Sequence, residues 1–167
     1  MRPIVEHLET SAFGRPLTEW EVSNDLSHKL AMGEVCPAWP IKSHELIALC
    51  PAVLQMLART KYKLAGNKRP PPDMLVVKGN VSLHSDCSGI IALTLLKVQP
   101  FSEDSNTSFN KSPWEHANYL WSQKTLIEMK EGTTVIFDTN QEHAWFCSGL
   151  ATFLSVPVLK QRVRTMV

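Results

Sequence analysis

The stretch MLVVKGNVSLHSDCSGIIALTLLKV, residues 74–98, decides the fold that we expect for this chain of 167 residues. Its apolar, β-branched runs are broken by Lys78-Gly79-Asn80 and by Cys87-Ser88-Gly89, a pattern typical of strands joined by tight turns. The second run leads into His84-Ser85-Asp86. Side chains two residues apart on a strand lie on the same face of the sheet. His84 and Asp86 can therefore converge on one metal ion.

A second segment, residues 132–145 (GTTVIFDTNQEHAW), supplies a candidate third ligand. We expect an apolar strand over residues 133–138, followed by a polar turn that delivers His143 at the start of another apolar run. Two histidines and one carboxylate make the facial triad that suits non-haem Fe(II), with open positions for a cosubstrate and dioxygen. His84, Asp86 and His143 are therefore the predicted metal ligands and catalytic residues.

Together the two segments resemble the double-stranded β-helix of the Fe(II)/2-oxoglutarate-dependent dioxygenases. In that family a His-x-Asp on an early barrel strand is followed by a Gly-x-x-x-x-Phe strand and a distal His, and His84, Asp86 and His143 stand at the matching positions. The resemblance covers residues 74–164. It implies a jelly-roll or cupin-like core, Fe(II) and 2-oxoglutarate as cofactors, and hydroxylation or demethylation of a substrate with dioxygen.

The chain departs from this family at the cation that pairs with the distal carboxylate of 2-oxoglutarate. Many members carry an Arg about ten residues after the distal His, where this chain has Thr-Phe-Leu at residues 152–154. Arg162 and Arg164 resemble the longer spacing of the AlkB-like nucleic-acid dioxygenases, and Lys97 resembles the lysine of the JmjC-like hydroxylases. We expect Arg162 to take this cofactor-binding role first, Arg164 second and Lys97 third.

The whole chain is predicted to be one α+β domain. Residues 1–73 form its helical N-terminal part, with helices expected from Thr18 to Gly33 and from Ser43 to Gly66. These helices pack on a double-stranded β-helix core, jelly-roll or cupin-like, formed by residues 74–167. Strands are expected around residues 3–5 and at 74–77, 81–86, 90–98, 125–129, 133–138, 143–147, 151–157 and 159–165.

Residues 99–124 are predicted to form an insertion loop within this core. A loop of this length in a compact domain is usually functional or mobile. Its second half carries Trp114 and Trp121, which either wall a flat substrate or anchor the loop on the barrel. We name both tryptophans as candidate substrate contacts and leave the anchoring role open.

Composition sets limits on the partners of the chain. A formal net charge of +1 gives no general electrostatic attraction to nucleic acid. No apolar run reaches the roughly 20 residues that span a bilayer, and the N-terminus lacks the apolar segment of a secretory signal. We therefore expect a cytoplasmic protein without membrane contact. The four cysteines have no Cys-x-x-Cys spacing, which argues against a structural zinc site.

Three functions remain open. The first is an Fe(II)- and 2-oxoglutarate-dependent oxygenase, a hydroxylase or demethylase of a small molecule, a protein side chain or a nucleic-acid base. The second is a cupin-like metalloprotein that keeps the triad without 2-oxoglutarate, which the missing Arg would explain. The third is a non-catalytic β-sandwich binding or regulatory module in which His84 and Asp86 form a structural pair. Metal content separates the third from the others, and 2-oxoglutarate binding separates the first from the second.

Overall fold

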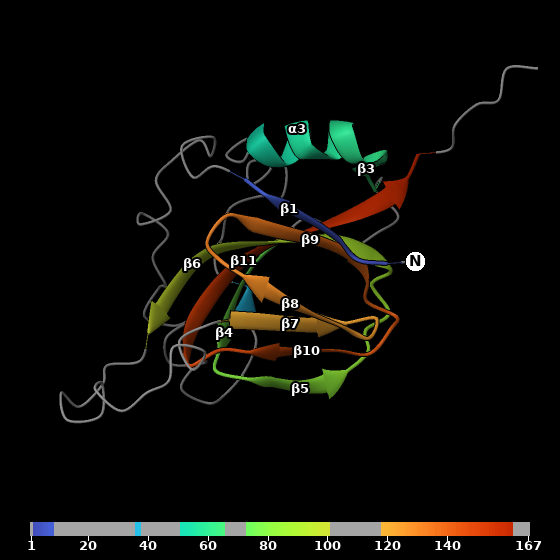
Figure 1. Ribbon diagram of the computed structural model, residues 1–167. Coiled ribbons are helices and arrows are strands. Elements are labelled where there is room, and N and C mark those ends of the chain that lie inside the picture. The colour runs from blue at the N-terminus through green and yellow to red at the C-terminus, as the bar shows by residue number, and fades with distance from the viewer. Residues whose placement is uncertain (1, 9–35, 38–50, 66–72, 101–117, 162–167) are drawn as a thin grey trace, which may run out of the picture.

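The computed structural model describes residues 2–8, 36–37, 51–65, 73–100 and 118–161 (Figure 1). These residues are mostly strands, and the helix among them is α3 (Pro51–Thr60). The strands are β1 (Ile4–His7), β2 (Cys36–Pro37), β3 (Tyr62–Leu64), β4 (Asp73–Lys78), β5 (Val81–His84), β6 (Ile90–Pro100), β7 (Asn118–Ser122), β8 (Thr125–Met129), β9 (Thr133–Asp138), β10 (His143–Phe146) and β11 (Gly149–Lys160). No helix in the described ranges has the length and apolar character needed to cross a membrane.

The strands form two curled antiparallel sheets, one of seven strands and one of four. The order in the larger sheet is β1-β9-β6-β11-β4-β2, with β3 also paired to β11, and the order in the smaller sheet is β5-β10-β7-β8. Figure 1 shows the smaller sheet facing the concave side of the larger one. This arrangement is consistent with a β-sandwich or a cupin-like fold.

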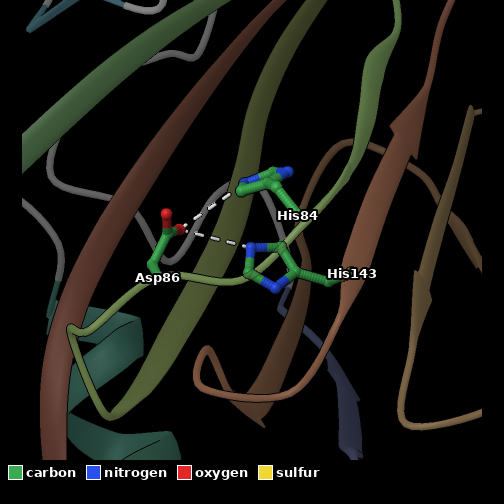
Figure 2. Close-up of side chains that lie close together, drawn as sticks. All are labelled: His84, Asp86 and His143. Carbon is green, nitrogen blue, oxygen red and sulfur yellow. Dashed lines mark ion pairs between the residues drawn. The ribbon is translucent and has the colours of Figure 1, made fainter.

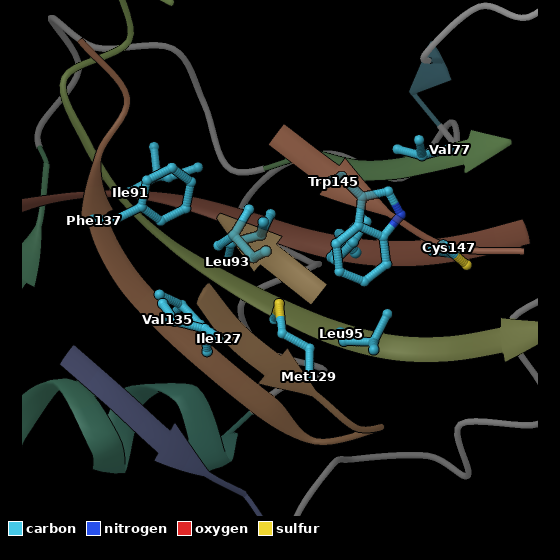
Figure 3. Packing of buried hydrophobic residues seen from close by; sticks show 13 residues of the cluster. Val77, Ile91, Leu93, Leu95, Ile127, Met129, Val135, Phe137, Trp145 and Cys147 are labelled. Atoms are coloured by element: carbon cyan, nitrogen blue, oxygen red, sulfur yellow. The ribbon is translucent and has the colours of Figure 1, made fainter. Parts of the chain in front are cut away.

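Apolar side chains from both sheets fill the space between them (Figure 3). On β6, alternate residues enter this core cluster, as expected for a strand with one face turned toward it. Burying one such side chain contributes roughly 1.5–3 kcal/mol relative to leaving it exposed. The core cluster consists of Val77, Ile91, Leu93, Leu95, Leu120, Ile127, Met129, Val135, Phe137, Trp145, Cys147, Ala151 and Phe153.

The larger sheet is also buried on its other face. Ala92 and Leu96 alternate with the cluster residues of β6 and are fully buried. Figure 1 shows α3 above this face, and the helix side chains Val53, Met56 and Leu57 are buried. Burial on both faces explains why β6 reads as a nearly continuous apolar run instead of an alternating one. Thr94 is a buried polar residue within this apolar run, and its hydroxyl shares a hydrogen bond of 2.8 Å with the Thr134 hydroxyl on β9.

The predicted α+β class, with N-terminal helices packed on a β-helix core, is wrong for the described residues, which are mostly β and contain one helix. The helix predicted from Ser43 to Gly66 ends earlier, at Thr60. Lys61 then adopts a left-handed φ of 62°, which stops the helix. Residues 62–64 instead form β3, which pairs with β11 and buries Tyr62. The helix predicted from Thr18 to Gly33 lies outside the described residues.

The strand predictions for residues 74–98 and 125–147 are confirmed to within a few residues. The two strands predicted at 151–157 and 159–165 are one strand, β11, through Lys160. Pro157 does not end it: the residue stays paired with Ile91 of β6, and its carbonyl accepts the N–H of Ala65, which follows β3, at 3.0 Å. The N–H and C=O of one strand residue point to the same side, so the missing N–H of Pro157 faces Ala65 at the end of β3, and the pairing with β6 is kept.

Candidate metal centre

His84, Asp86 and His143 come together beside the space between the two sheets (Figure 2). Asp86 Oδ2 lies 3.6 Å from His84 Nε2 and 3.3 Å from His143 Nε2. The candidate ligand atoms of the three residues all lie within 4.8 Å of one another. Ligand atoms that share one ion at about 2.1 Å are separated by roughly 3–4 Å. The predicted triad therefore has the spacing of a possible metal site.

Strand pairing brings the two histidines together. His84 is the last residue of β5 and His143 is the first of β10, and the two are direct partners in the antiparallel register. Directly opposed residues present their side chains on the same face of the sheet. The two rings have centroids 4.3 Å apart and are tilted by 58°.

The turn between β9 and β10 holds the third ligand in place. Asp86 lies beyond the end of β5, and its backbone N–H donates a 2.8 Å hydrogen bond to the carbonyl of Thr139. Thr139, which is buried, donates to the carbonyl of Gly89 from its own N–H at 2.8 Å and from its hydroxyl at 2.6 Å. The loop that carries Asp86 and the turn that precedes His143 therefore form one hydrogen-bonded unit.

Backbone carbonyls orient both imidazole rings. His84 Nδ1 lies 2.7 Å from the carbonyl of Ser82, and His143 Nδ1 lies 2.9 Å from the carbonyl of Gln141. Because a carbonyl oxygen only accepts, the proton of each neutral ring sits on Nδ1. Each Nε2 then presents its lone pair toward Asp86. Ligating histidines use the same second hydrogen bond to fix their tautomer and orientation.

The site is buried on one side and open on the other. The side chain of His143 is 8% exposed, whereas those of His84 and Asp86 are 37% and 48% exposed. Behind His143, the ring of Phe137 packs edge-on with its centroid 5.3 Å away. A structural zinc site encloses its ion with four protein ligands, whereas a catalytic site keeps a position open. Within the described ranges the site has three candidate ligands and one exposed side, which matches a catalytic site.

Lys97, a predicted cosubstrate ligand, does not face the metal centre. It pairs with Thr152 of β11, and its neighbour Val98 packs against the core cluster. The side chains of adjacent strand residues point to opposite faces, so Lys97 lies on the outer face of the larger sheet. Among residues 152–154, where the resemblance places the cationic residue, the ring of Phe153 packs against that of Trp145 with centroids 4.8 Å apart. Arg162 and Arg164 lie outside the described residues.

The candidate substrate contact Trp121 lies on a strand instead of a loop. It belongs to β7 and pairs with Ala144 and with the exposed Leu126. The adjacent Ser122 is buried opposite His143, so alternation places Trp121 on the outer face of the smaller sheet. This geometry does not place Trp121 over the metal. Trp114 lies outside the described residues.

Sequence reasoning missed the residues that support the triad. The sequence indicated the polar turn before His143. It did not indicate that the carbonyl of Thr139 would accept the N–H of Asp86, or that the carbonyl of Gln141 would lie beside Nδ1 of His143. Gln123 was also missed: its Oε1 accepts the N–H of Asp138 at 3.1 Å and ties the β7–β8 hairpin to the same turn. Apart from the contact between Gln141 and His143, these contacts join separate segments, for which single side-chain types give no signal.

No protein-family model matches the chain, and no curated protein has significant sequence similarity to it. The chemistry of the site therefore has to be inferred from its own residues.

Proposed function

We propose that the chain is a mononuclear non-haem metal enzyme, an Fe(II)-dependent oxygenase whose ion is held by His84, Asp86 and His143. The observation that supports this most is the convergence of two Nε2 atoms on a carboxylate oxygen, with both Nδ1 atoms at hydrogen-bonding distance from backbone carbonyls. Three acceptors facing one another repel until a cation lies between them. Two histidines and one carboxylate with open positions are the ligand set of Fe(II) oxygenases.

The residues of the chain position the ion and control access to it. Bound Fe(II) would supply the activation of dioxygen, which no side chain provides. His143, backed by Phe137, closes the inner side against water, while His84 and Asp86 border the exposed side by which a substrate can enter. The carbonyls of Ser82 and Gln141 keep both Nε2 atoms free to bind the ion.

The proposed cosubstrate is 2-oxoglutarate, whose distal carboxylate requires a cationic partner. The described residues do not fit this requirement: none of those that are buried is a lysine or an arginine. Of the three residues that the sequence predicts for this role, Arg162 and Arg164 remain candidates, because Lys97 lies on the outer face. The apolar interior around Phe153 favours a second candidate, a cupin-like metalloprotein that uses the same triad without 2-oxoglutarate.

Metal analysis followed by 2-oxoglutarate titration tests these functions. Protein purified without added nickel or chelator should hold about one Fe(II), Mn(II) or Co(II) per chain, because the triad is one site. His84→Ala and Asp86→Ala should each lose most of this metal, whereas His7→Ala, which removes an exposed histidine of β1, should keep it. Metal without 2-oxoglutarate binding would support the second candidate. Protein that holds no metal would contradict both and favour a binding module.

A further inference from the structure

Ser122 is a buried hydroxyl beside the metal centre. It is the last residue of β7 and is 0% exposed, and within the described part of the chain its Oγ has no hydrogen-bond partner. Buried hydroxyls are nearly always hydrogen-bonded, because burial removes their bonds to water. A hydroxyl without a protein partner indicates that something other than these residues is its acceptor.

The strand register fixes where this hydroxyl lies. Ser122 is the direct partner of His143 between β7 and β10, so both side chains are on the inner face with Cβ atoms about 4.5–5.5 Å apart. Its direct partner on β8, Thr125, is exposed, and its next neighbours on that face, Leu120 and Trp145, belong to the core cluster. The indole Nε1 of Trp145 also has no partner in the described residues, but it is turned toward Val77 and Cys147 (Figure 3).

The charge of the centre indicates what kind of ligand would accept this hydrogen bond. A divalent ion with one carboxylate and two neutral imidazoles keeps one net positive charge, which favours an anionic oxygen ligand at the open positions. A chelating carboxylate would fill two of these positions. Ser122, whose strand partner is the candidate ligand His143, supplies a hydroxyl on the buried side of the centre.

We infer that the Ser122 hydroxyl donates a hydrogen bond to an oxygen of a small oxo-acid or dicarboxylate chelated at the metal centre. This inference rests on the proposed metal site and names the ligand class of that site. It makes Ser122 a ligand-binding residue on the buried side of the centre, while His84 and Asp86 border the open side.

The test uses the full chain loaded with Co(II), and oxalate is the probe ligand. The visible absorption of Co(II) reports the binding of oxalate. Ser122→Ala should keep the Co(II) affinity of the parent and bind oxalate about tenfold more weakly, because a hydrogen bond to a charged acceptor is lost. Ser122→Thr keeps the hydroxyl and should restore most of the affinity. The matched control is Thr125→Ala: Thr125 is the exposed partner of Ser122 on β8, and its loss should leave oxalate binding unchanged.

Stability of the metal-free protein separates a ligand-binding role from a structural one. Replacing an unpartnered buried hydroxyl by a methyl group should leave the midpoint of urea unfolding unchanged or raise it. Equal oxalate affinity in the parent and in Ser122→Ala, with Co(II) bound to both, would overturn the inference. A Ser122→Ala chain that unfolds at clearly lower urea concentration, or does not fold, would also overturn it by showing a structural role. A parent chain that binds no Co(II) would instead refute the proposed metal centre itself.

Discussion

His84 and His143, far apart in the sequence, are direct partners across β5 and β10, with ring centroids 4.3 Å apart. Main-chain pairing of two strands thus fixes two of the three candidate ligands relative to each other before any metal binds. The third, Asp86, is tied to the turn that precedes His143 through its backbone N–H. Metal binding at such a site costs little conformational entropy, because the folded sheet already holds the ligands in place.

Metal affinity should fall steeply in acid. Each imidazole must offer the lone pair of Nε2 to bind an ion, so protons compete with the metal for these nitrogens. Affinity should therefore be lower at pH 5.5 than at pH 8. Co(II) titrations between pH 5.5 and 8 measure the effect. An affinity that does not change with pH would exclude histidine ligation.

Thr139→Val should weaken both the fold and the metal site. The substitution removes the 2.6 Å hydrogen bond to the carbonyl of Gly89 from a buried position, at a cost of about 1–3 kcal/mol in the free energy of unfolding. Loosening of the Asp86 loop should also reduce Co(II) affinity in the folded protein. Urea unfolding and Co(II) titration measure the two effects, with the exposed Thr125→Val as control. Unchanged metal affinity would show that the loop is held without this hydroxyl.

Arg162→Ala should weaken binding of 2-oxoglutarate to the metal-loaded protein by ~2 kcal/mol or more, since a charge-assisted pair is lost. Oxalate has no distal carboxylate and should bind the parent and this variant equally. Lys97→Ala should bind 2-oxoglutarate like the parent, because Lys97 lies on the outer face. Calorimetry with both ligands gives the comparison. If the Arg162 variant is unaffected, Arg164→Ala is the next to measure.

Gly132→Ala should be among the most destabilising single substitutions. Gly132 has a φ of 93°, and a Cβ atom there would lie 2.3 Å from the carbonyl oxygen of Leu8. Both the strained backbone and the clash with main-chain atoms lower the free energy of unfolding, together by roughly 3 kcal/mol or more. Gly79→Ala, at a φ of 66°, should cost less, about 1 kcal/mol. Urea unfolding of both variants checks this order.

Cys147 should resist alkylation compared with Cys87. Burial raises the pKa of the Cys147 thiol above its ordinary value, although a backbone hydrogen bond at Gly149 partly opposes this. Only the thiolate reacts, so a raised pKa and restricted access both slow modification near neutral pH. Iodoacetamide at pH 7.5 should label the exposed Cys87 first, as followed by peptide mass spectrometry. Equal labelling rates in folded protein would place Cys147 at an accessible surface.

The sequence by itself determined the positions of most described strands and the identity of the three candidate ligands. Strand alternation, glycine turns and the His-x-Asp spacing are local signals, and local signals suffice for a strand and for two ligands at its end. The helical pattern after Ser43 was less reliable. The pairing of residues 62–64 with β11 outweighed it, and that pairing has no signature in the neighbouring residues.

The tertiary structure alone decided which face each side chain takes and what supports the ligands. Period-two alternation from Ile91, Leu93 and Leu95 would turn Lys97 inward, but an irregularity in the pairing of β6 with β11 just before it turns Val98 inward instead. One extra residue reverses every later side chain on a strand, and only the partner strand reveals it. The pairing of Ser122 with His143 and the hydrogen bonds of Thr139 likewise join distant segments, so they follow from the folded sheets and not from local sequence.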